Sequence, residues 1–242
     1  MVTDCQNCPL RKIEIFEDLG RDELAYMQRF KHGELKIDPQ TTVMMQGSNS
    51  PQLFTALKGM GLRYKTLPDG RRQVVNFVLP GDFIGLQAGV MGEMKHSVEA
   101  TTPMVLCVFN RSEFWSLYKN QPERAFDVTW AAAVEEHFLG EALASLGQMN
   151  ATERMSWGLL RFFLRCQALG LVDGDRCPFP YRQQDLADAL GLSLVHTNKT
   201  LMKLRERQLL SLEDGILALH APEELEELAT LEIDPVLRRP LI

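Results

Sequence analysis

Residues 181–204, with the sequence YRQQDLADALGLSLVHTNKTLMKL, decide the fold of this chain. Leu186 and Leu190 lie at helical spacing, so the first half of the stretch predicts a short helix with one apolar stripe. Gly191 follows at the position where a helix end takes the left-handed backbone conformation, which glycine adopts without steric cost. Ser193 is typical of a helix N-cap. The stretch therefore predicts two short helices joined by a tight turn.

The second predicted helix has one buried face and one exposed face. Thr197, Leu201 and Leu204 keep helical spacing and form the buried stripe. Two helices joined in this way present the N-terminal half of the second helix to the major groove of DNA. The candidate DNA-binding residues are Gln183, Gln184, Ser193, Val195, His196, Asn198, Lys199 and Lys203. The alternative is a helical hairpin whose outer face is only solvated.

The residues that follow predict a β-hairpin. Residues 210–212 and 216–219 are short apolar runs, and the Glu-Asp-Gly sequence between them is typical of a tight turn. A helix-turn-helix followed directly by a hairpin is a winged helix, which is much rarer by chance than a helical hairpin alone. This combination favours DNA binding.

Length and composition limit the classes of protein to consider. The 242 residues suit one large or two modest domains. There is no run of about 18 apolar residues, and the N-terminus lacks the apolar core of a signal peptide, so we expect a cytoplasmic protein without a membrane partner. The odd number of cysteines, five, favours free thiols over disulfides. A Gly-rich phosphate loop, a catalytic triad and a convincing metal-ligand spacing are missing, so we expect no enzyme.

The net charge of −6 is unevenly distributed along the chain. Residues 1–150 contain 15 Lys/Arg and 18 Asp/Glu, residues 151–212 contain 9 and 6, and residues 213–242 contain 2 and 8. The helix-turn-helix segment thus carries a net charge of +3, as attraction to phosphates requires. Because this excess is modest, we expect a monomer to bind DNA weakly and a dimer to be needed.

The first 118 residues are β-rich. Short apolar runs alternate with turn residues at a spacing of about 8–12 residues, which predicts a sandwich or barrel. The predicted strands are residues 42–45, 53–57, 61–67, 73–79 and 104–109. Residues 80–85, with the sequence PGDFIG, predict a glycine-punctuated bend.

Residues 122–148 predict one long helix with two apolar lines along it. We expect one line to pack on the β domain of the same chain and the other on a second copy of the helix. The candidate dimerisation residues are Phe126, Trp130, Ala133, His137, Gly140 and Ala144. The small residues among them let two backbones approach closely, and we expect His137 to be an ordinary interface histidine rather than a pH switch. Asn150 and Glu153 then predict a capping box for the next helix.

In this order, the β-rich domain, the bend, the long helix and the winged helix resemble the Crp/Fnr superfamily of bacterial transcription regulators. The resemblance extends from Cys5 to about Leu219, and its most specific pieces are residues 80–85 and 184–193. It implies an α+β fold with an N-terminal β-roll (a jelly roll like that of cyclic-nucleotide-binding domains), a long dimerisation helix and a C-terminal winged helix-turn-helix. It also implies a homodimer on a palindromic double-stranded DNA operator, a sensing β-roll, and RNA polymerase as a partner.

The predicted domain boundaries follow from these elements. They are residues 1–118 for an N-terminal arm and the β-roll sensor, 119–149 for the dimerisation helix, 150–221 for the winged helix-turn-helix domain and 222–242 for an acidic tail. We expect the tail to form a short amphipathic helix that packs on the wing or stays solvated.

The sequence departs from the cyclic-nucleotide-binding members of this superfamily. Those members place a Glu just after the bend and an Arg-Ser or Arg-Thr pair a short loop later. Here Leu86 and Gln87 follow the bend, residues 94–97 are MKHS, and no arginine occurs in residues 73–110. Without the carboxylate for the ribose and the guanidinium for the phosphate, we expect no cyclic nucleotide cofactor.

The oxygen-sensing members bind an iron–sulfur cluster through three N-terminal cysteines and one in the β-roll. This chain has Cys5 and Cys8, and Cys107 lies close to the fourth family position, but the third N-terminal cysteine is absent. Because a four-iron cluster usually needs four thiolates, we expect no cofactor, with thiols that are structural or redox-active. The alternatives are an Fnr-like redox- or iron–sulfur-sensing regulator that uses Cys5, Cys8 and Cys107, and another metal at these thiols.

The resemblance also suggests how bases are read. It places Lys199 where the family has a base-reading arginine, so Lys199 is expected at guanine, while Asn198 suits adenine and Val195 suits a thymine methyl group. The two glutamines that begin the first helix, together with Ser193, are expected at phosphates. The competing class of function is a ligand-binding sensor module that acts through protein contacts.

Overall fold

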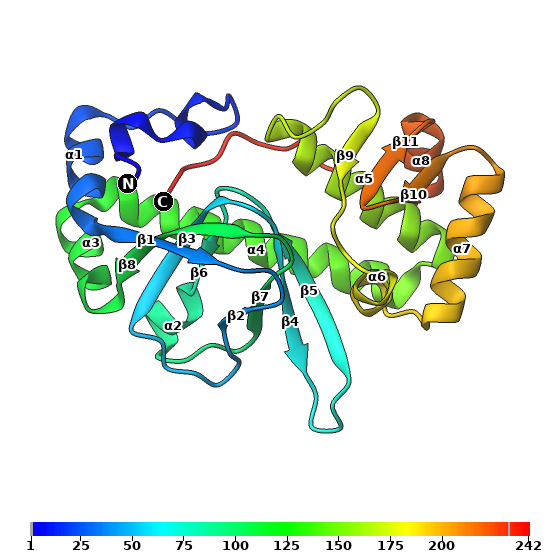
Figure 1. The fold of residues 1–242 in the computed structure, drawn as a ribbon, viewed down its shortest axis with the longest axis horizontal. Helices are drawn as coiled ribbons and strands as arrows, with labels where there is room; N and C mark the ends of the chain where they lie inside the picture. The colour runs from blue at the N-terminus through cyan, green and yellow to red at the C-terminus, as the bar shows by residue number, and fades with distance from the viewer. Residues whose placement is uncertain (1, 232) are drawn as a thin grey trace. The chain divides into compact units, whose positions relative to one another are not determined.

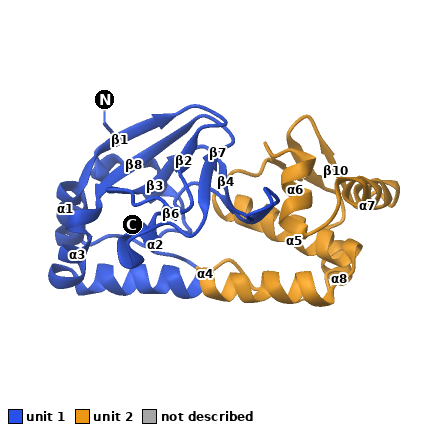
Figure 2. Cartoon of the chain, turned by 90° about the horizontal axis from the view of Figure 1, so that it is seen from below, with its two compact units in different colours: residues 1–134, 238–242 blue, residues 135–237 orange. Residues whose placement is uncertain are grey.

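The computed structural model describes residues 2–231 and 233–242 of the chain (Figure 1). They form two compact units, residues 1–134 with 238–242 and residues 135–237 (Figure 2). Helix α4 (Pro122–Gln148) contributes residues to both units. Among the described helices, none combines the length and the apolar character that crossing a membrane requires.

Two antiparallel sheets of four strands form the first unit. In spatial order, one sheet contains β1 (Lys31–Ile37), β8 (Met104–Asn110), β3 (Gln52–Lys58) and β6 (Phe83–Ile84). The other contains β2 (Thr42–Met44), β7 (Ser97–Ala100), β4 (Gly61–Thr66) and β5 (Arg72–Val78). Because the chain crosses repeatedly from one sheet to the other, this is the predicted β-roll of jelly-roll type.

The core of the first unit lies between these sheets. Phe54 and Leu106 from one sheet and Val78 and Val98 from the other belong to one cluster, and each is at most 3% exposed. Burying a side chain of this size stabilises a fold by about 1.5–3 kcal/mol. The apolar runs that predict the strands therefore supply this core, and the five consecutive buried residues of β3 show that both faces of this strand are covered.

The predicted strands correspond to β2, β3, β4, β5 and β8. The sequence pattern did not reveal three strands, three helices and three short 3₁₀ turns of this unit. The strands are β1, β6 and β7, the helices are α1 (Arg21–Phe30), α2 (Leu86–Met91) and α3 (Phe114–Asn120), and the turns are η1 (Cys5–Asn7), η2 (Pro9–Lys12) and η3 (Arg111–Glu113). Burial along strand β1 is irregular and does not alternate from residue to residue. The strand takes its place in the sheet by pairing with β8, which is distant in the sequence.

The predicted bend after β5 is present and requires its glycine. Gly81 has φ of 88°, and a Cβ atom there would lie 2.2 Å from the ring of Phe16. The next residue, Asp82, is buried, and its carboxylate accepts a hydrogen bond from Arg239 at 2.8 Å. The bend thus connects residues near both ends of the chain within the first unit.

The second unit combines the end of α4 with a helix-turn-helix and a small sheet. Its other helices are α5 (Ala151–Ala168), α6 (Gln183–Leu190), α7 (Leu194–Glu206) and α8 (Pro222–Leu228). Its antiparallel sheet has the order β10 (Leu210–Glu213), β11 (Ile216–Leu219) and β9 (Arg176–Pro178). Strands β10 and β11 form the predicted hairpin, and β9 adds a third strand that the sequence did not reveal. The predicted capping box at Asn150 and Glu153 is also present.

The acidic tail predicted over residues 222–242 is not a separate segment. Helix α8 packs on α5, with Leu225 completely buried. The last five residues belong to the first unit, where Leu241 and Ile242 are each 7% exposed and the Thr55 hydroxyl donates a hydrogen bond to the carbonyl of Ile242. The sequence did not predict this arrangement. The segment is acidic overall, and an apolar pair after two arginines forms neither a helical nor a strand pattern.

Candidate nucleic-acid interface

The turn between α6 and α7 has the geometry that the sequence predicted. Gly191 ends α6 with φ of 62° and ψ of 36°, and its N–H bonds to the carbonyl of Ala187. A Cβ atom at this position would lie 2.9 Å from a terminal methyl group of Leu146, which can shift, so the left-handed backbone is the main reason why the site favours glycine. At the other end of α6, Asp185 is buried and its carboxylate accepts the N–H of Arg182 at 2.9 Å.

Helix α7 begins at its predicted N-cap and buries its predicted stripe. The Ser193 hydroxyl accepts the N–H of His196 at 3.2 Å. Thr197, Leu201 and Leu204 are all buried. Packing of these residues therefore fixes the orientation of α7, so that its opposite face is exposed.

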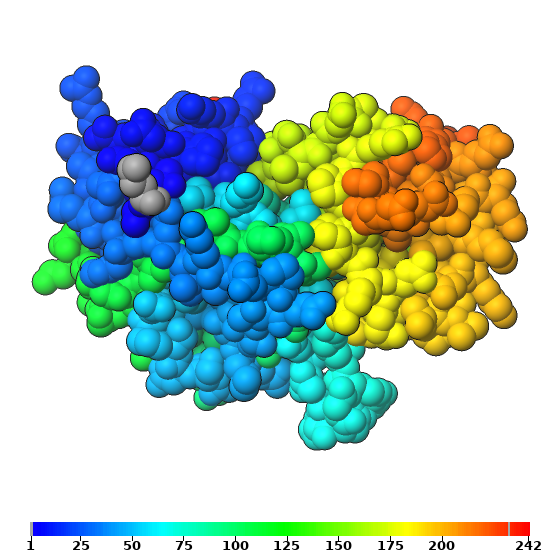
Figure 3. Space-filling model, viewed as in Figure 1, coloured from blue at the N-terminus to red at the C-terminus, as the bar shows by residue number. Residues whose placement is uncertain are grey.

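All of the candidate DNA-binding residues are exposed, and α7 forms part of the molecular surface (Figure 3). They are Gln183, Gln184, Ser193, Val195, His196, Asn198, Lys199 and Lys203. Val195 is 65% exposed, which leaves its methyl groups accessible for contact with a thymine methyl group. The N-termini of α6 and α7 lie beside this set, and helix N-termini attract phosphates. The arrangement provides groups for both phosphate contact and base contact.

Sequence reasoning missed the residue that braces the helix-turn-helix from within. Arg154 on α5 donates hydrogen bonds to the carbonyl of Leu190 at 2.7 Å and to the carbonyl of Met149 at 2.9 Å. It thus ties the C-terminal end of α6 to the start of α5. The amino-acid sequence carries no signal for this role, because both partners are backbone carbonyl groups and one of them, that of Leu190, is 36 residues away.

The candidate dimerisation residues lie along one face of α4. Ala133, His137, Gly140 and Ala144 are exposed, and Phe126 is 70% exposed despite its size, whereas Trp130 is half-buried. Leu143, which was not predicted, is 72% exposed on the same helix. A helix with this much apolar surface in one chain is typical of an interaction surface.

Three cysteines from separate parts of the first unit line one small cavity of about 40 Å³, together with Leu241 and Ile242. The cysteines are Cys5, Cys8 and Cys107. Burial raises the pKa of the Cys5 thiol and raises that of Cys107 to about 11, although the nearby Lys31 ammonium opposes both shifts. Within the described residues, the three sulfur atoms do not all lie within 4.8 Å of one another.

This cavity does not suit a four-iron cluster. It offers three thiols rather than four and has room for a few water molecules only. The approach of Cys107 to the N-terminal pair was not expected from the sequence, since it depends on β8 and the N-terminal arm coming together.

The region after the bend shows what replaces the cyclic-nucleotide ligands. Residues 86–91 form α2, and the side chain of Gln87 accepts the N–H of Lys95 at 3.0 Å. The ammonium of Lys95 is paired with Glu93. The lysine of this loop is therefore engaged with a carboxylate of the same loop.

Known proteins share both units of this chain. Residues 34–121 match a cyclic nucleotide-binding domain and residues 153–228 match a Crp-like helix-turn-helix domain. The nitrogen fixation regulation protein FixK of Rhizobium meliloti is 32% identical over 198 residues, which cover 78% of this chain and 84% of that protein. FixK of Bradyrhizobium diazoefficiens is 29% identical over 227 residues, 93% of each chain. The structure of FixK2 from Bradyrhizobium japonicum superposes with a TM-score of 0.75 at 23% identity, covering 83% of this chain and 98% of that one.

A winged helix-turn-helix whose reading helix is exposed, together with a matching Crp-like domain, defines a DNA-binding transcription regulator. The chain belongs to the Crp/Fnr family. The predicted fold class and the predicted function as a transcription regulator of this type are thereby confirmed.

Proposed function

We propose that the chain acts as a homodimer on a two-fold symmetric operator, with the β-roll as its sensor and RNA polymerase as its partner at the promoter. The exposed apolar face of α4, led by Phe126 at 70% exposure, is the observation that carries this proposal. Two copies joined along α4 present two α7 helices, and each reads one half-site. The relatives named transcriptional activators, AadR of Rhodopseudomonas palustris and FnrL of Cereibacter sphaeroides, support activation rather than repression.

Selection of bound fragments from the genome of the source organism tests this function. We expect enrichment of a palindromic site, and an affinity that falls steeply with salt because counterions are released from phosphates. Binding that is independent of both sequence and salt would instead support the competing class, a sensor module that acts through protein contacts.

We propose further that the signal is not a cyclic nucleotide. Calorimetric titration with cyclic AMP and cyclic GMP is expected to show no saturable binding at micromolar concentrations, because Lys95 is paired with Glu93 and no arginine lies in residues 73–110. A micromolar dissociation constant for either nucleotide contradicts this prediction.

A second candidate function is redox sensing at the thiol cavity, which the convergence of Cys5, Cys8 and Cys107 favours. We propose instead that these thiols are structural and that no iron–sulfur cluster is held there. The Cys5→Ser/Cys8→Ser variant is then expected to bind the operator as the unchanged chain does, in both oxidised and reduced buffers. The reason is that burial holds the thiols of Cys5 and Cys107 protonated near neutral pH.

Alkylation rates provide the pH test of the same proposal. With a pKa of about 11, Cys107 is almost entirely protonated at pH 7.5, so it is expected to react with iodoacetamide roughly 10²-fold more slowly than an ordinary exposed thiol. Its rate is expected to rise as the pH increases toward 11. Rapid labelling at neutral pH, or a brown iron-containing protein that bleaches in air and loses operator affinity, contradicts the structural role.

A further inference from the structure

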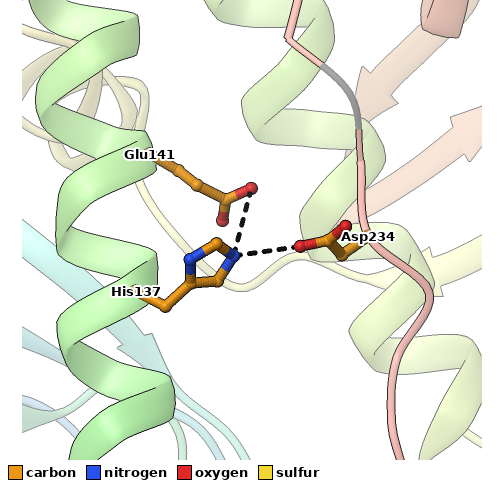
Figure 4. Close-up of side chains that lie close together, drawn as sticks. All are labelled: His137, Glu141 and Asp234. Atoms are coloured by element: carbon orange, nitrogen blue, oxygen red, sulfur yellow. Dashed lines mark hydrogen bonds and ion pairs between the residues drawn. The ribbon is translucent and has the colours of Figure 1, made fainter.

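Three side chains that bind metals well lie close together in the second unit (Figure 4). His137 and Glu141 are one turn apart on α4, and Asp234 lies in the segment after α8. Nε2 of His137 is 2.9 Å from Oδ2 of Asp234 and 3.9 Å from Oε1 of Glu141. Within the described residues, this is the only group of three His, Cys, Asp or Glu ligand atoms that all lie within 4.8 Å of one another.

Glu141 is a largely buried carboxylate that is held through one of its two oxygen atoms. Its side chain is 9% exposed, and its Oε2 accepts a hydrogen bond from Arg161 at 2.5 Å. The other oxygen, Oε1, faces His137 across 3.9 Å, which is too long for a hydrogen bond. The second oxygen of this largely buried carboxylate thus faces the imidazole, in the group of ligand atoms that also includes Asp234.

Neighbouring residues hold the Glu141 side chain in place, whereas the other two ligand side chains can change their orientation. The guanidinium carbon of Arg161 lies 4.7 Å from the centroid of the Phe138 ring. This contact holds the guanidinium in place, and the guanidinium in turn orients the Glu141 carboxylate. Such an outer partner is what orients a metal-ligating carboxylate in known metal sites. His137 and Asp234 are each 61% exposed, and their side chains are therefore free to close the remaining gap around an ion.

The charges favour a cation at this place. With the imidazole acting as a neutral ligand, the two carboxylates and the Arg161 guanidinium leave a net charge of −1. Imidazole nitrogen and carboxylate oxygen are both ligands of Zn²⁺, and three protein ligands with water in the fourth position complete its tetrahedral coordination. Mg²⁺ and Ca²⁺ prefer oxygen ligands alone.

We propose that His137, Glu141 and Asp234 bind one first-row divalent cation, with Zn²⁺ as the type case, and that the ion fastens the segment after α8 to α4. This site lies outside the thiol cavity and does not depend on DNA binding. It gives His137 a role other than that of the interface histidine expected from the sequence.

Calorimetric titration of the full, untagged chain with Zn²⁺ tests the proposal. A Cys5→Ser/Cys8→Ser background removes the two thiols that are not buried, and the remaining three, Cys107, Cys166 and Cys177, are buried. We expect saturable binding of one Zn²⁺ per chain, weakened about tenfold or more by Asp234→Asn and by His137→Ala. Asp234→Asn keeps the shape of a side chain that is 61% exposed and removes its charge, so we expect the variant to remain folded. Mg²⁺ is expected not to compete.

The matched control is His32→Ala. His32 forms the same kind of pair with Glu113, at 2.8 Å and 42% exposure, without completing a three-ligand group among the described residues. We expect its loss to leave Zn²⁺ affinity unchanged. Co²⁺ bound to the chain is expected to lack the charge-transfer absorption of a thiolate ligand. No saturable Zn²⁺ binding, or equal affinity in the Asp234→Asn and unchanged chains, overturns the proposal.

Discussion

Lys199→Ala is expected to abolish discrimination between the operator and random DNA while the protein remains folded. Lys199 is exposed on α7, opposite the buried Leu201 and Leu204, so its truncation leaves no cavity. A good base contact contributes about 1–3 kcal/mol of discrimination per half-site, so two half-sites lose about 2–6 kcal/mol. This corresponds to roughly 30-fold to 10⁴-fold in relative affinity. Competition gel shifts with operator and random duplexes measure the ratio directly.

Lys203→Ala is the matched control, because it removes the same charge from an exposed position further along α7. If Lys203 contacts a phosphate, its replacement by alanine is expected to weaken binding to operator and random DNA alike and to make the affinity depend less steeply on salt. If Lys199→Ala behaves in the same way as Lys203→Ala, then Lys199 contacts phosphate and the base-reading role belongs to another residue of α7.

The helix-turn-helix was predictable from the sequence because its determinants are local. Gly191, Ser193 and the Asn150 capping box each act on backbone groups within four residues, so the amino-acid types alone indicate where helices begin and end. The hairpin of the wing is equally local, since Asp214 and Gly215 both adopt positive φ in its turn. The exposure of Lys199 and its neighbours follows directly from these boundaries.

Features that depend on distant partners were not predictable in the same way. Strand β1 is irregular in burial and takes its place from β8, about 70 residues later. Arg239 and Ile242 pack in the first unit although the chain reaches them through the second. His137 meets Asp234 across 97 residues of sequence. In each case the contact is stabilised only after other elements have folded, so neither residue carries a local signal for it.

Gly140→Arg is expected to convert the proposed dimer into a monomer and to reduce operator affinity by roughly 10²-fold to 10⁴-fold, the gain that linking two half-site contacts provides. Gly140 is on the exposed face of α4, and no atom of its own chain lies within 4 Å of a Cβ placed there. The arginine therefore fits the isolated chain but separates two helices that approach closely. It also raises helix propensity by up to about 1 kcal/mol, so a loss of affinity cannot be attributed to a weaker α4.

Sedimentation of the purified variant measures the oligomeric state, and gel shifts on the selected operator measure the affinity. Ala132→Arg is the matched control: Ala132 is also exposed on α4, but it lies roughly 80° around the helix axis from Gly140 and outside the line of small residues. We expect this control to remain dimeric and to bind the operator as the unchanged chain does. A Gly140→Arg protein that is still dimeric, with unchanged operator affinity, would show that two copies meet along a different face, because an arginine at a close helix contact has no room to be accommodated.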